Sequence, residues 1–133
     1  MANPNIVNVT TINGNTAYLT PNATTANVAW QYNGTTSITG LTPVSGQVIK
    51  VDNIVATNVT SSAATVSVAI SDNPTYASGV PHYIAYQISV PPNAVMTITD
   101  KTTAFYVTEN QSVGVVVGTS SAINFVASFE AIS

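Results

Sequence analysis

Apolar and polar residues alternate along much of the chain with a period of two, which is the pattern of a β-strand with one buried face. The alternation is clearest in three segments, residues 65–71, 84–90 and 123–131. It is weaker in residues 6–12, 48–59, 95–100 and 113–118. Thr and Val are frequent throughout, and β-branched residues favour strands over helices. We therefore predict strands and no long helix.

The apolar faces of the three clearest segments define the predicted core. The residues on these faces are Val66, Val68, Ile70, Ile84, Tyr86, Ile88, Ile123, Phe125 and Phe129. A strand that alternates cleanly has one buried and one solvated face, as in a sandwich of two sheets. We expect these nine residues to be largely buried and to line one core.

Turn signals separate the predicted strands. Asn13-Gly14 and Asn33-Gly34 predict tight turns, because Asn and Gly tolerate positive φ. Polar or proline-containing turns are expected at residues 91–93, 100–103, 108–111 and 118–121. Short strands separated by such turns predict one all-β domain over residues 1–133. The predicted architecture is an antiparallel β-sandwich, jelly-roll-like, with about eight strands.

Two connections are longer than a turn requires, residues 33–46 and 72–82. Long loops in a compact domain are often functional, and aromatic residues on loops often anchor protein contacts. Segment 1–8 contains Pro4 and three asparagines, and we expect it to extend as an N-terminal arm that docks against a neighbour. The candidate contact residues are Asn3, Pro4, Trp30, Tyr32, Tyr76, His82 and Tyr83. Tyr76 is the preferred anchor, because Trp30 and Tyr83 would serve equally well to cap the core.

The charge content excludes one class of partner. Charged residues make up 5% of the 133 residues, and only two are cationic, Lys50 and Lys101. Nucleic-acid binding needs clustered Lys and Arg to displace counterions from phosphate, so no nucleic-acid partner is expected. The chain has no Cys, which excludes metal sites built on thiolates. A chain of this length buries enough surface to fold without a disulfide or metal.

Few residues could carry catalysis. His82 is the only histidine, and no nucleophile motif accompanies it. The carboxylates are Asp52, Asp72, Asp100, Glu109 and Glu130. Asp100 and Glu109 fall in predicted turns, Asp52 is expected to pair with Lys50, and Glu130 lies on the polar side of its strand. Asp72-Asn73 lacks the further oxygen ligands of a calcium loop. We expect no enzyme, no catalytic residue, no cofactor and no metal.

No transmembrane segment is predicted, because the apolar stretches are only a few residues long. The opening MANPNIVNV lacks the basic and apolar regions of a secretory signal peptide. We therefore expect a protein made in the cytoplasm of a host and released by lysis rather than by export, with no membrane partner.

Four segments of the chain resemble small virion structural proteins of marine cyanophages. They are MANPNIVNV, QVIKVDNIVATNV, ISVPPNAVMTITDKTTAFYVTENQSVGV and VASFEAIS. Within them Pro91, Asp100-Lys101, Thr108-Glu109-Asn110 and Ile132-Ser133 occupy the positions of the family's hairpin, acidic turns and tail. The likeness covers most of the chain in order, and the opening nonapeptide is its most distinctive part. The sequence departs from the family pattern in a longer 20–46 region and in its low charge.

The resemblance implies a β-sandwich on the exterior of a bacteriophage virion, first of all a capsid decoration (cement) protein. The neck, tail or a fibre is the other place it implies. Implied partners are the major capsid protein or other virion proteins, and copies of the chain itself, arranged as a trimer.

A carbohydrate-binding or adhesin module is the alternative reading of the same fold. Such a module would present Trp30, Tyr32 or Tyr76 to the face of a sugar. Glycan binding that is lost on substitution of Trp30 would favour this alternative, and stoichiometric copies on purified particles would favour the virion protein.

Overall fold

The computed structural model describes residues 9–21, 28–29, 41, 43 and 45–133. Within these residues the chain forms nine strands and two short 3-10 helices. The strands are β1 (Ile12–Leu19), β2 (Val28–Ala29), β3 (Val48–Asn58), β4 (Ala64–Ser71), β5 (Pro81–Val90), β6 (Val95–Thr99), β7 (Phe105–Val107), β8 (Ser112–Val117) and β9 (Ile123–Ile132). The helices are η1 (Tyr76–Ser78) and η2 (Lys101–Thr103). The all-β prediction is confirmed.

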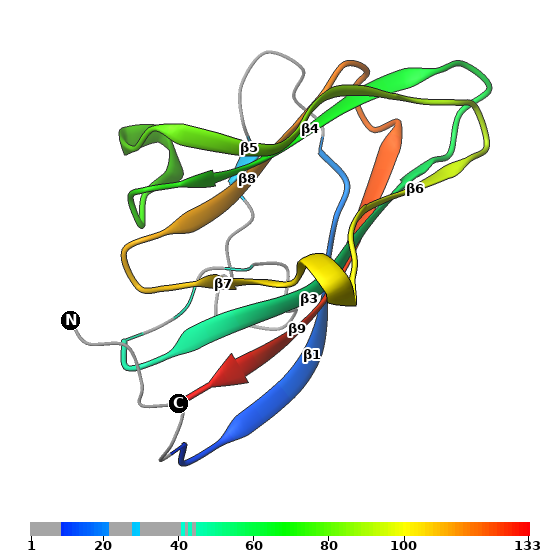
Figure 1. Ribbon diagram of the computed structural model, residues 1–133. Coiled ribbons are helices and arrows are strands. Elements are labelled where there is room, and N and C mark those ends of the chain that lie inside the picture. Colours follow the sequence, from blue (N-terminus) through cyan, green and yellow to red (C-terminus); the bar gives the residue numbers. More distant parts are fainter. Residues whose placement is uncertain (1–8, 22–27, 30–40, 42, 44) are drawn as a thin grey trace.

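The strands form two antiparallel sheets that lie over one another (Figure 1). The first sheet has the order β1-β9-β3-β6, with β7 also paired to β3, and the second sheet has the order β2-β8-β4-β5. The predicted β-sandwich is confirmed. The pairs β1 with β9, β2 with β8, β3 with β6 and β4 with β5 are nested along the chain. Nested pairs are how a jelly roll is wound, although the jelly-roll assignment itself stays a prediction.

The core lies between the two sheets, and the residues that the alternation predicts for it in β9 and in most of β4 are buried. In β4 the residues of the opposite face, Ser67, Ala69 and Ser71, are buried as well, which the alternation did not predict. Val66 and Val68 from β4, and Ile123 and Phe125 from β9, are fully buried, and Phe129 is nearly so. From Ile123 to Phe129 every second residue of β9 is buried. The ladder of β9 with β1 is unbroken, and the one register shift in its ladder with β3 places the extra residue in β3. Ile70, at the end of β4, is half-buried.

Strand β5 contradicts the predicted core. Its three apolar residues Ile84, Tyr86 and Ile88 are 37%, 58% and 37% exposed. The strand lies at the edge of the second sheet and pairs only with β4 among the described strands. It also carries two extra residues relative to β4, because the register shifts on both sides of Val68. Each extra residue reverses the alternation of side chains, so the three residues do not share one face.

The predicted tight turn at Asn13-Gly14 is also wrong. Both residues lie inside β1, where Asn13 is opposite Ala131 and Gly14 is opposite Glu130. The ladder to β9 is unbroken from residue 12 to residue 19. A continuous ladder of backbone hydrogen bonds outweighs the local preference of an Asn-Gly pair for a turn. Asn33-Gly34 lies outside the described residues.

Truncation of Phe125 should destabilise the protein strongly. Phe125 is fully buried in the core, so Phe125→Ala leaves a cavity and should lower the free energy of unfolding by about 3–5 kcal/mol. The neighbouring Val126 is exposed, and Val126→Ala should change it by no more than about 0.5 kcal/mol. Urea unfolding of both variants, followed by circular dichroism, measures the difference. Equal effects of the two substitutions would contradict the assigned register of β9.

Candidate functional site

The structure describes three of the seven candidate contact residues. Tyr76, His82 and Tyr83 lie in η1 and at the beginning of β5. Asn3, Pro4, Trp30 and Tyr32 lie outside the described residues. The predicted long loop at 72–82 is shorter than expected, since η1 occupies its middle and β5 begins at residue 81.

Tyr76 is buried, with 4% of its surface exposed, so the prediction of an exposed anchor is wrong. Its ring packs directly on Gly114 of β8, where a Cβ atom would collide with ring carbons. The ring therefore fills the space that a side chain at position 114 would need. The Ser112 hydroxyl donates to the Asn73 carbonyl at 2.7 Å, and the Ser71 hydroxyl donates to the Tyr76 carbonyl at 3.2 Å. These bonds hold the loop against the second sheet.

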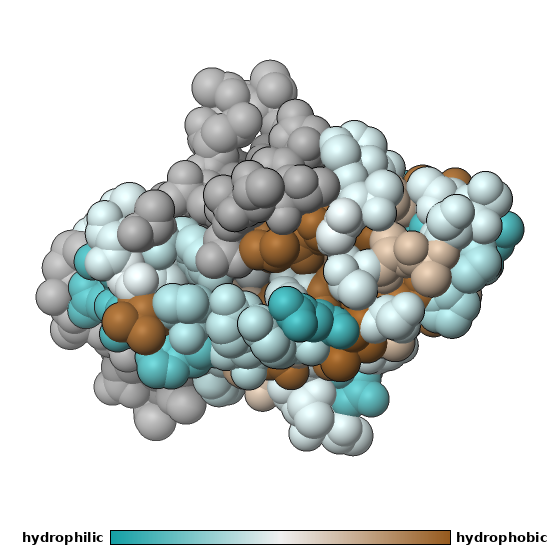
Figure 2. All heavy atoms as spheres, turned by 90° about the horizontal axis from the view of Figure 1, so that it is seen from above, coloured by the Kyte–Doolittle hydropathy of each residue, from teal (hydrophilic) through white to brown (hydrophobic). Residues whose placement is uncertain are grey.

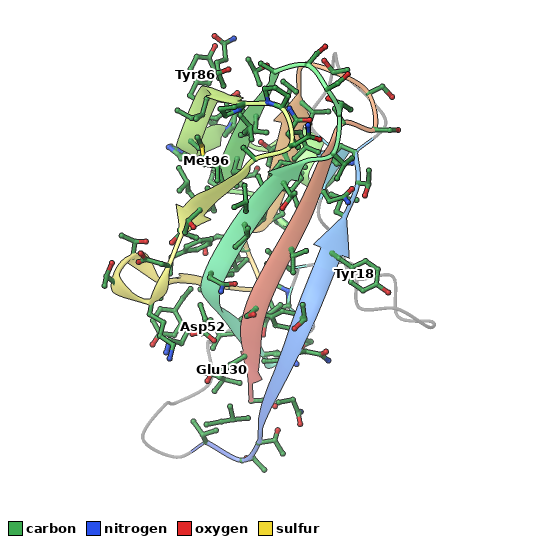
Figure 3. All side chains as sticks on the ribbon, turned by 90° about the vertical axis from the view of Figure 1, so that its right-hand side faces the viewer. Tyr18, Asp52, Tyr86, Met96 and Glu130 are labelled. Atoms are coloured by element: carbon green, nitrogen blue, oxygen red, sulfur yellow. The ribbon has the colours of Figure 1, made fainter. Side chains whose placement is uncertain are left out.

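The exposed aromatic residues near this loop are Tyr83 and Tyr86, here called the tyrosine pair. Their rings contact each other edge to face, with centroids 4.7 Å apart and an angle of 61° between the planes. Tyr83 is 45% exposed and Tyr86 is 58% exposed. In Figure 3 Tyr86 lies on the outside of the molecule, while Met96 lies below it on β6. Prediction from the sequence named Tyr83 and missed Tyr86, which it placed in the core.

The extra residues of β5 bring the two tyrosines together. Tyr83 lies opposite Ala69 of β4, and Ala85 lies opposite Val68, which faces the core. In regular alternation residues 83 and 86 would point to opposite faces. The backbone N–H of Gln87 donates to the Ser67 hydroxyl at 2.8 Å, and Gln87 has a φ of +49°. This irregular turn of the strand orients Tyr86 toward Tyr83.

Polar groups and two apolar side chains lie close to the tyrosine pair along the chain. The Nε2 atom of His82 is 4.0 Å from Oδ2 of Asp72, and Oδ1 of Asp72 accepts the Val80 N–H at 2.7 Å. Val80 and Ile84 are exposed. No Asp, Glu, Lys or Arg occurs between residues 73 and 99. Figure 2, which views the molecule from above, shows brown apolar side chains among pale residues and a few strongly hydrophilic, teal ones.

A second exposed surface covers the outer side of the first sheet. Tyr18, Val126 and Val55 are opposite one another in β1, β9 and β3, and Val95 of β6 is opposite Thr57, two residues further along β3. Tyr18, Val126 and Val95 are exposed, and Val55 is half-buried. We call these four residues the first-sheet face. The sequence signal for it is Val126, an apolar residue on the otherwise polar side of β9.

One lysine of the first sheet lies between two carboxylates. The Nζ atom of Lys50 lies 3.5 Å from Oδ1 of Asp52 and 4.0 Å from Oε2 of Glu130. Figure 3 shows Asp52 and Glu130 side by side on the same face of the sheet. The predicted pairing of Lys50 with Asp52 is confirmed. Exposed pairs of this kind contribute little to stability, about 0–1 kcal/mol.

Two further carboxylates have structural partners. One carboxylate oxygen of the buried Glu109 accepts the backbone N–H of Gly46, and its other oxygen, Oε2, has no hydrogen-bond partner in the described part of the chain. Asp100 caps η2, and hydrogen bonds from the side chain and backbone of Thr102 lower its pKa below the usual value. Across the described part of the chain, no group of three or more His, Asp and Glu residues could hold a metal ion.

No protein-family model, no curated protein and no solved structure matches the chain. In the ranges that the structure describes, no helix is long and apolar enough to span a membrane. The first-sheet face and the tyrosine pair are the two exposed surfaces that bear on function.

The buried hydroxyl of Tyr76 makes a testable contribution to stability. It has no hydrogen-bond partner among the residues that the structure describes, so Tyr76→Phe should raise the free energy of unfolding at pH 7 by about 1 kcal/mol. Burial, and to a lesser extent the nearby Tyr83, raises the pKa of Tyr76 from 10.0 to about 12. The folded state therefore holds this proton more tightly than the unfolded state, and the stability that results is lost as the pH rises from 10 to 12.

Tyr76→Phe lacks this titration, so its advantage over the wild type should grow across the same pH range. Urea unfolding of both proteins at pH 7, 10 and 11.5 measures the effect. A stability difference that does not change with pH would show that Tyr76 is not buried in solution.

Proposed function

We propose that this protein is a non-enzymatic structural protein on the exterior of a bacteriophage virion, most specifically a capsid decoration protein. The resemblance of its sequence to cyanophage virion proteins supports the proposal. The structural observation that carries it is the first-sheet face, a largely exposed apolar strip across a sheet with few charges. Large side chains of this kind gathered on one face are typical of a surface that packs against another protein.

The first-sheet face has the layout of a contact surface. Tyr18, Val126 and Val55 cross three neighbouring strands, so the apolar strip is about 10 Å wide. Thr20 and Asn124, linked by a hydrogen bond of 2.8 Å, border one end of the strip. The Lys50 ion pairs lie toward the other end. An apolar centre with a polar border is the usual arrangement of a protein interface.

The carbohydrate-binding alternative predicted from the sequence relied on Trp30, Tyr32 or Tyr76 as the residue that meets the sugar. Tyr76 is buried, so it does not present its ring to a ligand. Trp30 and Tyr32 lie outside the described residues, and for these two the alternative stays a prediction. Our proposal of a structural role rests on the resemblance and on the first-sheet face.

Self-association is part of the proposal, because the resemblance implies a trimer. The low charge is compatible with it, since little repulsion opposes the packing of copies side by side. We expect a mass of about three times the monomer mass of 13.7 kDa by light scattering coupled to size-exclusion chromatography. A monomer at every concentration, both free and after release from the particle, would contradict this expectation.

Quantitative mass spectrometry of purified particles tests the proposed function directly, because a decoration protein is present in many copies that bear a fixed ratio to the capsid protein. A copy number of zero would refute the proposal, and a handful of copies would move it to the neck, tail or fibre.

Reconstitution tests the contact surface. Particles stripped of the protein would be incubated with Tyr18→Ala/Val126→Ser or with Tyr83→Ala/Tyr86→Ala. Since few residues carry most of the energy of an interface, the first variant should bind about tenfold or more weakly than the wild type. The second variant, a matched control on the other sheet, should bind as the wild type does. The reverse result would show that the first-sheet face is not the contact.

A further inference from the structure

We propose that the tyrosine pair of β5 binds a neutral oligosaccharide. This activity is separate from the proposed structural role, because the pair projects from the second sheet and the first-sheet face belongs to the other sheet. The two proposals can therefore fail independently.

The aromatic rings supply the apolar part of such a site. Roughly half of each side chain is exposed, 45% for Tyr83 and 58% for Tyr86. The electron-rich face of an aromatic ring attracts the C–H groups that line one side of a sugar ring, and the phenol hydroxyl bonds to water or to a ligand at the ring edge. The angle of 61° between the planes gives two differently inclined contact surfaces. Two inclined rings suit a chain of sugars better than a single flat ligand.

The pair is fixed in position before any ligand binds. Tyr83 belongs to the ladder with β4, opposite Ala69, and its ring rests against the ring of Tyr86. The bond from the Gln87 N–H to the Ser67 hydroxyl holds the backbone next to Tyr86. Side chains that are already ordered lose little conformational entropy on binding, which matters for a weak ligand such as a sugar.

The groups beside the pair can bond to sugar hydroxyls without requiring a charged ligand. The phenol hydroxyls of Tyr83 and Tyr86 and the exposed amide of Gln87, next to Tyr86 in β5, donate and accept hydrogen bonds. His82 and Asp72 form a separate pair, since His82 and Tyr83 are consecutive in a regular part of the ladder and point to opposite faces. No Asp, Glu, Lys or Arg occurs between residues 73 and 99. Strand β5 therefore offers no counter-charge to a strongly charged ligand, whereas a neutral polyhydroxylated ligand would find partners.

Addition of a strand from another protein is the less favourable use of this edge. Bulges and prolines protect edge strands from pairing with a further strand. β5 has two register shifts, begins at Pro81 and is followed by Pro91 and Pro92. These features interrupt the row of backbone groups that a new strand would need. The outward surface of the tyrosine pair remains available, and a ligand that stacks on side chains can use it.

Binding by the free protein tests the proposal. The probes are four neutral hexasaccharides, cellohexaose, laminarihexaose, mannohexaose and chitohexaose, measured by saturation-transfer NMR and isothermal titration. We expect at least one probe to bind, and Tyr83→Ala/Tyr86→Ala to weaken that binding about tenfold or more. Tyr86→Phe keeps the ring and should retain most of the affinity.

Tyr106→Ala is the matched control, since Tyr106 is 50% exposed but lies on β7 in the first sheet. It should leave binding unchanged, and the melting temperatures of all variants establish that they are folded. Failure of every probe to bind, or equal losses for the control and the double variant, would overturn the proposal. It would also be overturned if the double variant bound the sugar normally but no longer attached to particles, because the pair would then be a protein contact.

Discussion

The central position of β9 is the constraint on which the first sheet depends. This strand pairs with β1 on one side and with β3 on the other, from Ile123 opposite Asn58 to Ile132 opposite Val48. Side chains alternate along a strand, so the register that buries Phe125 also turns Val126 and Glu130 outward. The register of β9 therefore determines which of its residues join the core, the first-sheet face and the ion pairs. A slip of one residue would bring the polar side of β9 into the core.

The second sheet departs from a regular sheet at Gly114 of β8 and at the two extra residues of β5, and each departure positions aromatic side chains. Gly114 leaves a gap on β8 that the ring of Tyr76 fills, and this contact holds η1 against the sheet. The two extra residues of β5 turn Tyr83 and Tyr86 to the same side. The first sheet thus presents the first-sheet face, which runs across its strands, and the second sheet presents the projecting rings of the tyrosine pair. A protein that attaches through one face and leaves the other free would be built in this way.

The success of sequence-based prediction differed between strands for physical reasons. β9 was predicted well because it lies inside its sheet with one face on the core and the other exposed, so its alternation reports burial directly. In β4 Val66 and Val68 were predicted correctly, but Ser67, Ala69 and Ser71 on the other face are buried as well. The sequence of β5 alternates as regularly as those of β4 and β9, because extra residues in the strand pairing do not change the order of apolar and polar residues. Ile84 and Tyr86 were therefore predicted to be in the core, although both are exposed. β1 was hidden because Asn13-Gly14 is a turn signal only when no partner strand competes.

The candidate sites were harder to predict than the fold. The burial of Tyr76 depends on a glycine 38 residues away in the sequence, and nothing local announces that contact. Tyr83 was a candidate from the sequence because it is an aromatic residue next to a predicted loop. Tyr86 comes into contact with Tyr83 only because β5 contains extra residues relative to β4, and the sequence does not show them. The first-sheet face combines residues from four strands, of which Val126 alone stood out in the sequence.

The ion pairs of Lys50 have a further consequence for the conditions that the fold tolerates. The pairs with Asp52 and Glu130 are partly exposed, and dissolved salt screens such pairs readily. Since they contribute little to begin with, little is lost when they are screened. The remaining stabilisation is apolar burial and backbone pairing, which salt does not weaken. The protein should therefore be about as stable in brine as in dilute buffer, and tolerate abrupt changes of salinity.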